Sequence, residues 1–305
     1  MDLNKVFTDL KNNFPNLKIY QNHPLAQYTT VKIGGPADIF INTQNSEEFL
    51  DVLKYLKQAE ATIFEEHSSQ GVLPQGSGTA KNSLQGENLT TVLGNGSNVL
   101  ISDSGIRGIV IKNDSQKVDL LPENKVKVSS GTQLSYLINF TLDHNLVGLE
   151  EFAYIPSTVG GAIAGNIHGV NKINFSKFVE SVEKYDDFII SAILNLKSGD
   201  SAPAKAQVQE IIQKKAAVQS MNSLGSVFKN IPNQDPTGMI IDQKLNLKGY
   251  SIGGAQISPK HANFIINNGS ATAKDYLALI NLIQSQMQTK FGFQFELEIK
   301  LLGNF

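Results

Sequence analysis

The chain of 305 residues contains no cysteine and no tryptophan, and its 26 basic residues include a single arginine, Arg107. Without cysteine, the protein cannot form disulfide bonds, thiolate zinc sites, Cys-ligated iron–sulfur clusters or a cysteine nucleophile. The absence also fits a reducing compartment. With one arginine, the chain has almost no residue that can clamp a carboxylate or phosphate through two parallel hydrogen bonds.

Net charge and long apolar runs are equally scarce. The net charge of −2 argues against a nucleic-acid-binding surface, which needs clustered basic residues. No run of about 18 consecutive apolar residues indicates a membrane span, and the N-terminal stretch, with Asp2 and Lys5, does not resemble a secretory signal. We therefore expect a cytoplasmic protein without nucleic-acid or membrane partners.

What the sequence does contain is enough apolar material for a packed core, with 41% hydrophobic residues. At about 150 residues per domain, the length suggests roughly two domains. Residues 1–14 have the spacing of an amphipathic helix, and 90–112 read as strand, glycine-rich turn, strand, turn and strand. Thr272 and Asp275 form a capping box that opens a helix ending at Lys290, and 293–301 alternate as a strand. The mixture predicts an α+β fold.

Two segments interrupt this pattern. Residues 61–88 are rich in Ser, Gly and Gln without periodicity, which predicts an extended surface loop or insertion. Between 197 and 205 the composition shifts to Lys, Ser, Gly, Asp and Pro. We place a domain boundary there, giving domains 1–200 and 201–305.

The first glycine-rich segment of interest is GNGSN at 94–98. It looks superficially like a dinucleotide fingerprint, and Asp114 lies about 20 residues further on. The match fails because the third glycine position holds Val99 and a strand, not a helix, is expected next. A turn of this composition can still hold a diphosphate on its backbone N–H groups. For this segment taken alone, an ordinary hairpin turn is the favoured explanation.

A second glycine-rich segment spans 155–162. Pro156 fixes one turn, and Gly160 and Gly161 permit close approach to a planar or phosphorylated ligand. The alternative is tight helix packing through small residues. Together with the glycine pair at 34–35, the two segments suggest a large, extended cofactor.

With these motifs in hand, the chain resembles the UDP-N-acetylenolpyruvoylglucosamine reductase family. The motifs that carry the resemblance follow the family order and cover most of the chain. They are TTVKIGGPADIFI (29–41), LGNGSNVLISDSGIRGIVI (93–111), GLEEFAYIPSTVGGAIAGN (148–166), LGSVFKN (224–230), GYSIGGAQISPKHANFIINNGSATAKD (249–275) and FELEIKLLG (295–303).

The resemblance implies a fold and a reaction. Residues 1–200 would form an FAD-binding domain of the vanillyl-alcohol-oxidase (PCMH-type) superfamily in two subdomains. Residues 201–305 would form an α+β substrate-binding domain whose last strand returns to the flavin. NADPH would reduce FAD, and a hydride and a proton would then convert UDP-N-acetylglucosamine enolpyruvate to UDP-N-acetylmuramate. The protein is expected to be a monomer.

The resemblance also implies roles for individual residues. Ser226 would donate the proton and Glu298 would be the second catalytic residue. Lys229, Asn230 and Gln256 would bind substrate. The expected cofactor-binding residues are Gly34, Gly35, Gly94, Asn95, Gly96, Ser97, Asn98, Ile155, Pro156, Ser157, Thr158, Gly160, Gly161 and Ala162.

Each of these residues also has an ordinary structural explanation. Ser226 could be a turn serine bonded to its own backbone, and Lys229 a solvated surface lysine. Glu298 could be a solvent-facing strand residue. His261 and Asn263, in the same stretch as Gln256, could equally be satisfied structural polar groups. The five histidines show no metal-ligand spacing, and we predict no metal site.

The sequence departs from the family at one functional point. The family carries a catalytic arginine, in a tyrosine–arginine motif, between the second glycine-rich segment and the strand at 188–196. Here only VEKYDD (182–187) lies between Ser181 and that strand. Arg107 belongs to the flavin domain and cannot replace the arginine, so Lys229 or Lys184 could compensate only in part. This leaves two alternatives open, a flavin or nucleotide-sugar binding protein with impaired catalysis and a different FAD oxidoreductase.

Overall fold

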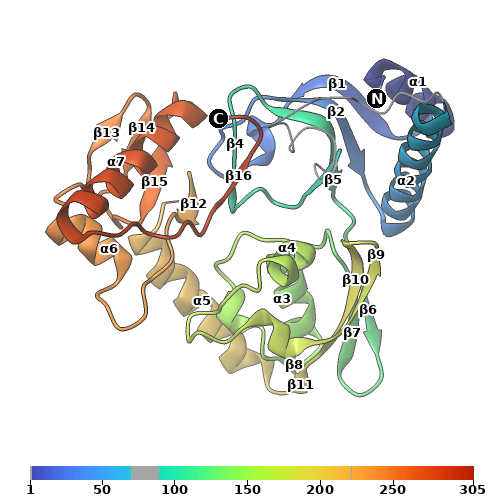
Figure 1. Cartoon of the computed structure of the whole chain (residues 1–305). Coiled ribbons are helices and arrows are strands. Elements are labelled where there is room, and N and C mark those ends of the chain that lie inside the picture. Colours follow the sequence, from blue (N-terminus) through green and yellow to red (C-terminus); the bar gives the residue numbers. More distant parts are fainter. Residues whose placement is uncertain (1, 70–88, 221) are drawn as a thin grey trace.

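The computed structural model describes residues 2–69, 89–220 and 222–305, which form three lobes around a central region (Figure 1). The first lobe is a four-stranded sheet in the order β1-β2-β5-β3, in which β5 runs parallel to both β2 and β3. Helices α1 and α2 pack their apolar sides on this sheet. The elements of the first lobe are α1 (Leu3–Asn13), β1 (Lys18–Pro24), a 3₁₀ turn (Ala26–Tyr28), β2 (Pro36–Thr43), α2 (Ser46–Ser69), β3 (Thr90–Leu93), β4 (Val99–Ile101) and β5 (Ile106–Asn113).

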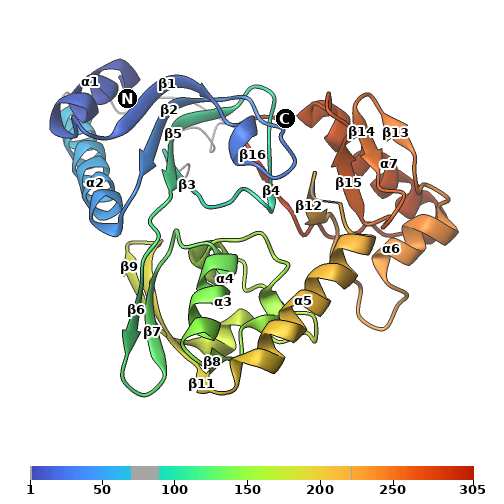
Figure 2. The same cartoon turned by 180° about the vertical axis from the view of Figure 1, so that it is seen from behind.

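The second lobe is an antiparallel sheet in the order β6-β7-β10-β9, and helices α3 and α4 pack over it. Helix α5 contacts α3 and leads toward the third lobe, as the rear view shows (Figure 2). Its elements are β6 (Val118–Leu121), β7 (Lys125–Ser129), α3 (Leu134–Asp143), β8 (Leu146–Val147), a 3₁₀ turn (Glu150–Phe152), α4 (Val159–Ala164), a 3₁₀ turn (Phe175–Phe178), β9 (Val179–Tyr185), β10 (Phe188–Asn195), β11 (Lys197–Ser198) and α5 (Ser201–Val218).

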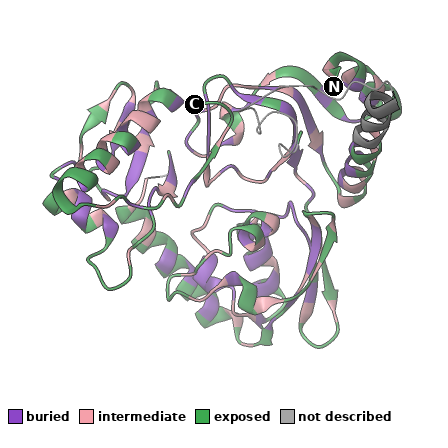
Figure 3. Ribbon diagram, in the orientation of Figure 1, coloured by how far each residue is buried: buried purple, intermediate pink, exposed green. Residues whose placement is uncertain are grey.

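The third lobe is a sheet in the order β12-β15-β14-β13 with α7 packed against it. From there the chain returns to the first lobe, where β16 pairs in parallel with β4. The burial map shows a separate core in each lobe (Figure 3). The third-lobe elements are β12 (Ser223–Ser226), α6 (Thr237–Met239), a π-helical turn (Ile240–Lys244), β13 (Ser251–Ile252), β14 (Ala255–Ile257), β15 (Phe264–Asn267), α7 (Ala273–Phe291) and β16 (Lys300–Leu302).

Several sequence expectations are confirmed. The fold is α+β, and the strand–turn–strand pattern over 90–112 matches β3, β4 and β5. Helix α7 begins at a complete capping box in which Thr272 and Asp275 satisfy one another's backbone N–H groups. These features were readable because each depends on residues close together in sequence.

Other expectations were wrong. Residues 61–69 belong to α2 and not to a loop, because Ala and Glu in this stretch favour helix; residues 70–88 lie outside the described part of the chain. The sequence also favours Ser46 as the cap of α2, but Asn45 holds that position, and its side chain accepts from Glu48 N at 2.9 Å. The segment 293–301 is mostly extended without ladder partners and forms a strand only from Lys300. Its alternation reflects packing of Phe293, Phe295, Leu297 and Ile299 on the third-lobe core rather than sheet pairing.

The region expected to separate two domains turns into the start of a helix. Asp200 caps α5 by accepting from Ala202 N at 2.9 Å, and Pro203 lies in the first helical turn, where its missing N–H costs nothing. Helix α5 packs on the second lobe through Ala204 and Val208. The polar composition at 197–205 thus coincides with the start of α5, and the domain boundary at residue 200 stays a prediction.

Candidate active site

A cavity of about 790 Å³ lies where the three lobes meet, and it gathers most of the expected site residues. Its wall includes the loop 94–98, which we call the first glycine loop, and part of residues 155–162, the second glycine loop. The third lobe contributes β12 and the chain leading to β16. The expected residues on the wall are Gly94, Asn95, Gly96, Ser97, Asn98, Ile155, Pro156, Ser157, Gly161, Ser226, Lys229, Asn230 and Glu298.

The first glycine loop connects β3 to β4 and presents open backbone donors. Within the described residues, the N–H groups of residues 95–98 donate to no protein acceptor. Gly96 adopts a φ of +59°, and a Cβ there would lie 2.2 Å from the carbonyl oxygen of Tyr28. Backbone N–H groups in folded proteins are normally paired, so this open array is suited to an anionic ligand.

The second glycine loop uses its backbone donors internally. Val159 N donates to Thr132 O at 2.9 Å and Gly160 N to Ser130 O at 2.7 Å. Thr158 caps α4 by accepting from Gly161 N. A Cβ on Gly160 would lie 3.0 Å from Ser130 Cβ, so this glycine serves packing. Gly161 is exposed and lies on the cavity wall.

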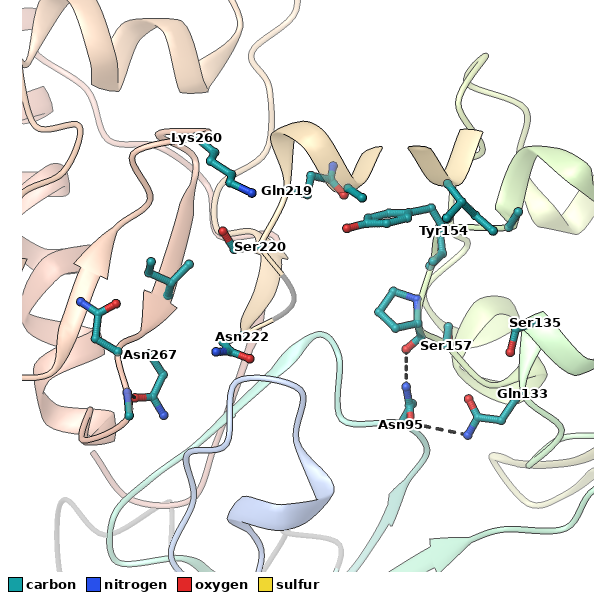
Figure 4. Close-up of a pocket in the computed structure, with 18 residues that line it drawn as sticks. Asn95, Gln133, Ser135, Tyr154, Ser157, Gln219, Ser220, Asn222, Lys260 and Asn267 are labelled. Carbon is teal, nitrogen blue, oxygen red and sulfur yellow. Dashed lines mark hydrogen bonds between the residues drawn. The ribbon is translucent and has the colours of Figure 1, made fainter. Parts of the chain in front are cut away.

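The two glycine loops touch one another. Asn95 Nδ2 donates to the carbonyl oxygen of Pro156 at 2.7 Å, and Asn95 Oδ1 accepts from Gln133 at 3.4 Å (Figure 4). A Cβ on Gly94 would lie 2.6 Å from Thr158 Oγ1. The first and second lobes are thereby held in a fixed relation at the cavity.

Ser226 ends β12 on the third-lobe side of the cavity. The ladder pairs Ser223 with Ile266 and Ser226 with Phe264, and the register shifts between these pairs. Gly225 has a φ of +77° at that irregularity. In the described part of the chain the Ser226 hydroxyl has no hydrogen-bond partner. A turn bond to its own backbone, the ordinary explanation for this serine, is therefore not formed.

Glu298 joins the serine strand to the first glycine loop through its backbone. Its N–H donates to Val227 O at 2.9 Å, and its carbonyl oxygen accepts from Asn98 Nδ2 at 3.2 Å. Lys300 N then donates to Asn98 O at 2.9 Å, where β16 joins β4. The exposed Glu298 side chain is on the cavity wall.

Two further expected residues lie beside Ser226. Lys229 pairs with Glu296, and the hydrogen bond to that carboxylate raises the pKa of the Lys229 ammonium. Asn230 Oδ1 accepts from Thr237 N at 2.9 Å, which leaves its amide nitrogen available at the cavity. Asn263, by contrast, uses both ends of its side-chain amide on the Phe228 backbone, at 3.1 and 2.8 Å, and is structural.

Some expected residues do not reach this cavity. Gly35 packs on the turn after β4, where a Cβ would lie 2.2 Å from Asp103 O. Gln256 Nε2 donates to Gly249 O at 3.0 Å on β14. The expected residues away from the described cavity wall are Gly34, Gly35, Thr158, Gly160, Ala162 and Gln256. Their ligand-binding roles stay predictions.

A second cavity of about 1080 Å³ adjoins the first (Figure 4). Both cavities share Asn95, residues 154–157, Gln219 and Ser220. Tyr154, Gln219, Ser220, Asn222 and Lys260 supply polar groups to its wall. Sequence reasoning missed these residues. Gln219, Ser220 and Asn222 lie outside the quoted motifs, and nothing in the motifs that contain Tyr154 and Lys260 marks those two as site residues. Only the packing of the three lobes brings all five together.

The cationic side chains at the first cavity are lysines. Lys172, Lys215, Lys229 and Lys300 line its described wall. Arg107 instead pairs with Asp38 at 2.7 Å on the first-lobe sheet and lines neither cavity. Lys184, on β9, also lines neither. The described wall therefore offers anions single-point ammonium groups rather than a planar guanidinium fork.

Two other features bear on function. Among the residues that the structure describes, no group of three or more His, Asp or Glu side chains is placed to hold a metal ion. No helix in those parts of the chain combines the length and apolar character needed to cross a membrane.

Comparison with known proteins agrees with this arrangement. A family model described as a FAD binding domain matches residues 83–186, which include both glycine loops. A model of the C-terminal domain of UDP-N-acetylenolpyruvoylglucosamine reductase matches residues 214–302, which include Ser226 and Glu298. The chain thus combines the two domain types that its resemblance implied.

Whole-chain relatives point the same way. The UDP-N-acetylenolpyruvoylglucosamine reductase of Caldanaerobacter subterraneus subsp. tengcongensis is 33% identical over 314 residues, covering 94% of each chain. That of Levilactobacillus brevis is 33% identical over 325 residues, covering 98% of this chain and 97% of its own. The crystal structure of the Thermus caldophilus enzyme (MurB) superposes with a TM-score of 0.70 at 27% identity, covering 94% of this chain and 99% of that one. The expected fold class is confirmed.

Proposed function

The chain belongs to the UDP-N-acetylenolpyruvoylglucosamine reductase family, and we propose that it is an FAD-dependent oxidoreductase that converts UDP-N-acetylglucosamine enolpyruvate to UDP-N-acetylmuramate with NADPH. The observation that carries the proposal is one cavity bounded by the first glycine loop, Ser226, Lys229 and Glu298. A cofactor-binding loop and a candidate proton donor thus face the same space.

The residues present fit FAD. The open N–H groups of 95–98 suit its diphosphate, because successive backbone donors in a tight turn form an anion-binding concavity. At Gly94 a side chain would collide with Thr158, so the two glycine loops approach as closely as glycine permits. At Gly96 it would collide with Tyr28, in the turn before β2. When bound, FAD supplies hydride transfer between NADPH and the substrate.

The chain's own part of the reaction is to place a proton and hold the substrate. The reduction adds a hydride to one carbon of the enolpyruvyl double bond and a proton to the other. We assign the proton to the hydroxyl of Ser226, whose partner-free state leaves it available to substrate. A serine hydroxyl is a weak acid, so the lobes must also exclude water around it. Lys229 supplies a positive charge toward an anionic nucleotide sugar.

The second cavity extends the space available to these ligands. Cavities of about 300–1,000 Å³ hold one drug-sized ligand. FAD and a nucleotide sugar are each larger than a drug-sized ligand. The cavity of about 790 Å³ is too small to hold the two together. The adjoining polar space around Gln219, Ser220 and Lys260 would take the part of a ligand that extends beyond it.

The lysine-only cavity also favours a second candidate function, a flavin and nucleotide-sugar binding protein that turns over poorly. Loss of a charge-assisted bond to a developing oxyanion lowers rate by about 100-fold or more. The two candidates make different predictions for one experiment on FAD-reconstituted protein. Absorbance spectra are recorded with and without the enolpyruvyl nucleotide sugar, and NADPH oxidation is then followed.

Its outcomes separate the possibilities. NADPH oxidation that depends on the nucleotide sugar supports the reductase. A flavin spectrum that shifts with the sugar, without turnover, supports the binding protein. A protein that takes up no FAD contradicts both, and activity on another alcohol or sugar alone would indicate a different FAD oxidoreductase.

We further propose that the enzyme works as a cytoplasmic monomer. Its substrate and NADPH are phosphorylated small molecules, and the chain's cavity draws its described wall from one copy of the protein. Light scattering coupled to size exclusion at micromolar concentration should give a mass near 33.2 kDa. A stable dimer would contradict the monomer without touching the proposed reaction.

A further inference from the structure

Two residues each hydrogen-bond both to the first glycine loop and to the segment 223–227. These two bridges lie one on each side of Ser226. Glu298 forms the bridge on the C-terminal side, between Asn98 and Val227. The bridge on the N-terminal side is formed by Thr30, a residue that lines neither cavity. The sequence analysis gave Thr30 no role of its own.

Thr30 binds both partners at once. Its backbone N–H donates to Gly96 O at 3.2 Å, and its hydroxyl donates to Ser223 O at 2.7 Å. The first bond holds the middle of the first glycine loop. The second holds the first residue of β12, three positions before Ser226. One residue thus sets the spacing between the loop and the serine strand.

The neighbours of Thr30 strengthen the connection. Val31 is fully buried in the third-lobe core, and its carbonyl oxygen accepts from Asn267 Nδ2 at 2.9 Å. Asn267 ends β15, the strand paired with β12, and its N–H donates to Asn222 O at 3.0 Å. Residues 30 and 31 are therefore fixed to the third-lobe sheet that carries Ser226, by hydrogen bonds and by burial of Val31.

We propose that Thr30 is a positioning residue that holds Ser226 at the correct distance from the first glycine loop. The proposal rests on the proposed function, because it assumes that the loop binds FAD and that Ser226 gives the proton. The irregular register between Ser223 and Ser226, with Gly225 at positive φ, leaves this short segment without a continuous ladder. Its position is then set by its two ends, Ser223 on Thr30 and Val227 on Glu298.

The hydroxyl of Thr30 is the part that can be removed cleanly. Thr30→Val has nearly the same shape and keeps the backbone bond to Gly96 O, but it loses the bond to Ser223 O. A displacement of about 1 Å at a reacting group can cost about 10²-fold in rate. Loss of this one bond is expected to slow proton delivery to substrate about tenfold, because the Glu298 bridge remains.

The test compares the FAD-loaded wild type with Thr30→Val and Thr30→Ser. Thr289→Val, on the exposed end of α7, is the matched control. Stopped-flow absorbance measures reduction of bound FAD by NADPH and, separately, its reoxidation by the enolpyruvyl nucleotide sugar. Hydrogen exchange of peptides covering 94–98 and 222–227, in protein free of FAD, measures the bridge directly.

The proposal expects Thr30→Val to reoxidise about tenfold more slowly, to be reduced at the wild-type rate, and to exchange faster in both peptides. Thr30→Ser should recover the wild-type behaviour, and Thr289→Val should not depart from it. Wild-type reoxidation in Thr30→Val, equal slowing of both steps, or loss of FAD would each overturn a positioning role. Failure of the wild type to reoxidise with this sugar would instead contradict the proposed function, and the exchange measurement would still report on the bridge.

Discussion

The two glycine loops line the same cavity with similar residues, yet they differ in what their backbones offer. The first glycine loop (94–98) leaves four successive N–H groups without a protein acceptor in the described chain. In the second (155–162), backbone N–H groups donate to oxygen atoms of Ser130, Thr132 and Thr158. The open N–H groups of the first loop are thus suited to an anion. The second loop lines the cavity with small residues whose N–H groups are already paired.

This difference shows that glycine content does not define a phosphate site. Gly96 is needed because its backbone is left-handed and touches Tyr28. Gly160 is needed because Ser130 packs against it. The two roles differ only in whether the backbone N–H groups are paired. The second glycine loop finds its acceptors at Ser130 and Thr132, directly after β7.

The largest expected effect tests whether the proton donor is Ser226, which lies on β12 and in neither glycine loop. Ser226→Ala should retain FAD and lower turnover by about 10²–10⁴-fold, the usual contribution of a general acid. Flavin absorbance measures retention, and substrate-dependent NADPH oxidation measures turnover. Ser251→Ala, on β13, is the control. Undiminished turnover would remove Ser226 from the mechanism.

The next effect tests the binding role of the first glycine loop. Gly96→Ala forces a side chain into left-handed backbone, at about 1–2 kcal/mol, and against Tyr28 O at 2.2 Å. We expect FAD affinity to fall about tenfold or more, since each 1.4 kcal/mol is about tenfold. Titration followed by flavin fluorescence gives the affinity. An unchanged affinity would mean that the loop does not hold the cofactor.

A smaller effect tests the packing role within the second glycine loop. Gly160→Ala overpacks the contact with Ser130 and should lower the free energy of unfolding by about 1–3 kcal/mol. The folded fraction should bind FAD as the wild type does. Denaturant unfolding and FAD titration measure the two quantities. A large loss of affinity without loss of stability would make this loop a binding loop as well.

The smallest effect comes from the neighbouring glycine. A Cβ on Gly161 would meet only the hydroxyls of Ser157 and Thr158, at 2.8 and 3.3 Å. The hydroxyl of Ser157 can rotate away, and alanine favours helix by about 0.5–1 kcal/mol. Gly161→Ala should therefore change stability by under about 1 kcal/mol in unfolding and FAD affinity by less than about threefold. If it behaves like Gly160→Ala, the distinction between the two positions fails.

The sequence predicted local features and failed where distant contacts decide. The capping box of α7 and the strand–turn–strand around the first glycine loop depend on neighbouring residues and were predicted correctly. The last nine-residue alternation was misread as one strand, because its inward side chains pack on the third-lobe core while only the end of the segment pairs in a sheet. Strand β1 was missed, since its pairing with β2 depends on the intervening turn.

The candidate site divides in the same way. The motif around Ser226 and the first glycine loop could be found from sequence spacing. Gln219, Ser220 and Asn222 could not, because they lie outside the quoted motifs and reach the second cavity only when the lobes pack together. Gly34 and Gly35 were grouped with the cofactor loops on composition. The fold packs Gly34 against Ile101 of β4 and Gly35 against the turn that follows, and their cofactor-binding role stays a prediction.

The sequence by itself determined the family and the two domain types, because motifs with fixed spacing encode local backbone shape and side-chain type. The residues that it assigns to the chemistry stay predictions. Tertiary structure decided which glycines offer free N–H groups, which cations face the cavity, and how Thr30 and Glu298 join the two halves. Those properties depend on hydrogen bonds between residues nearly two hundred positions apart, whose partners no local pattern can specify.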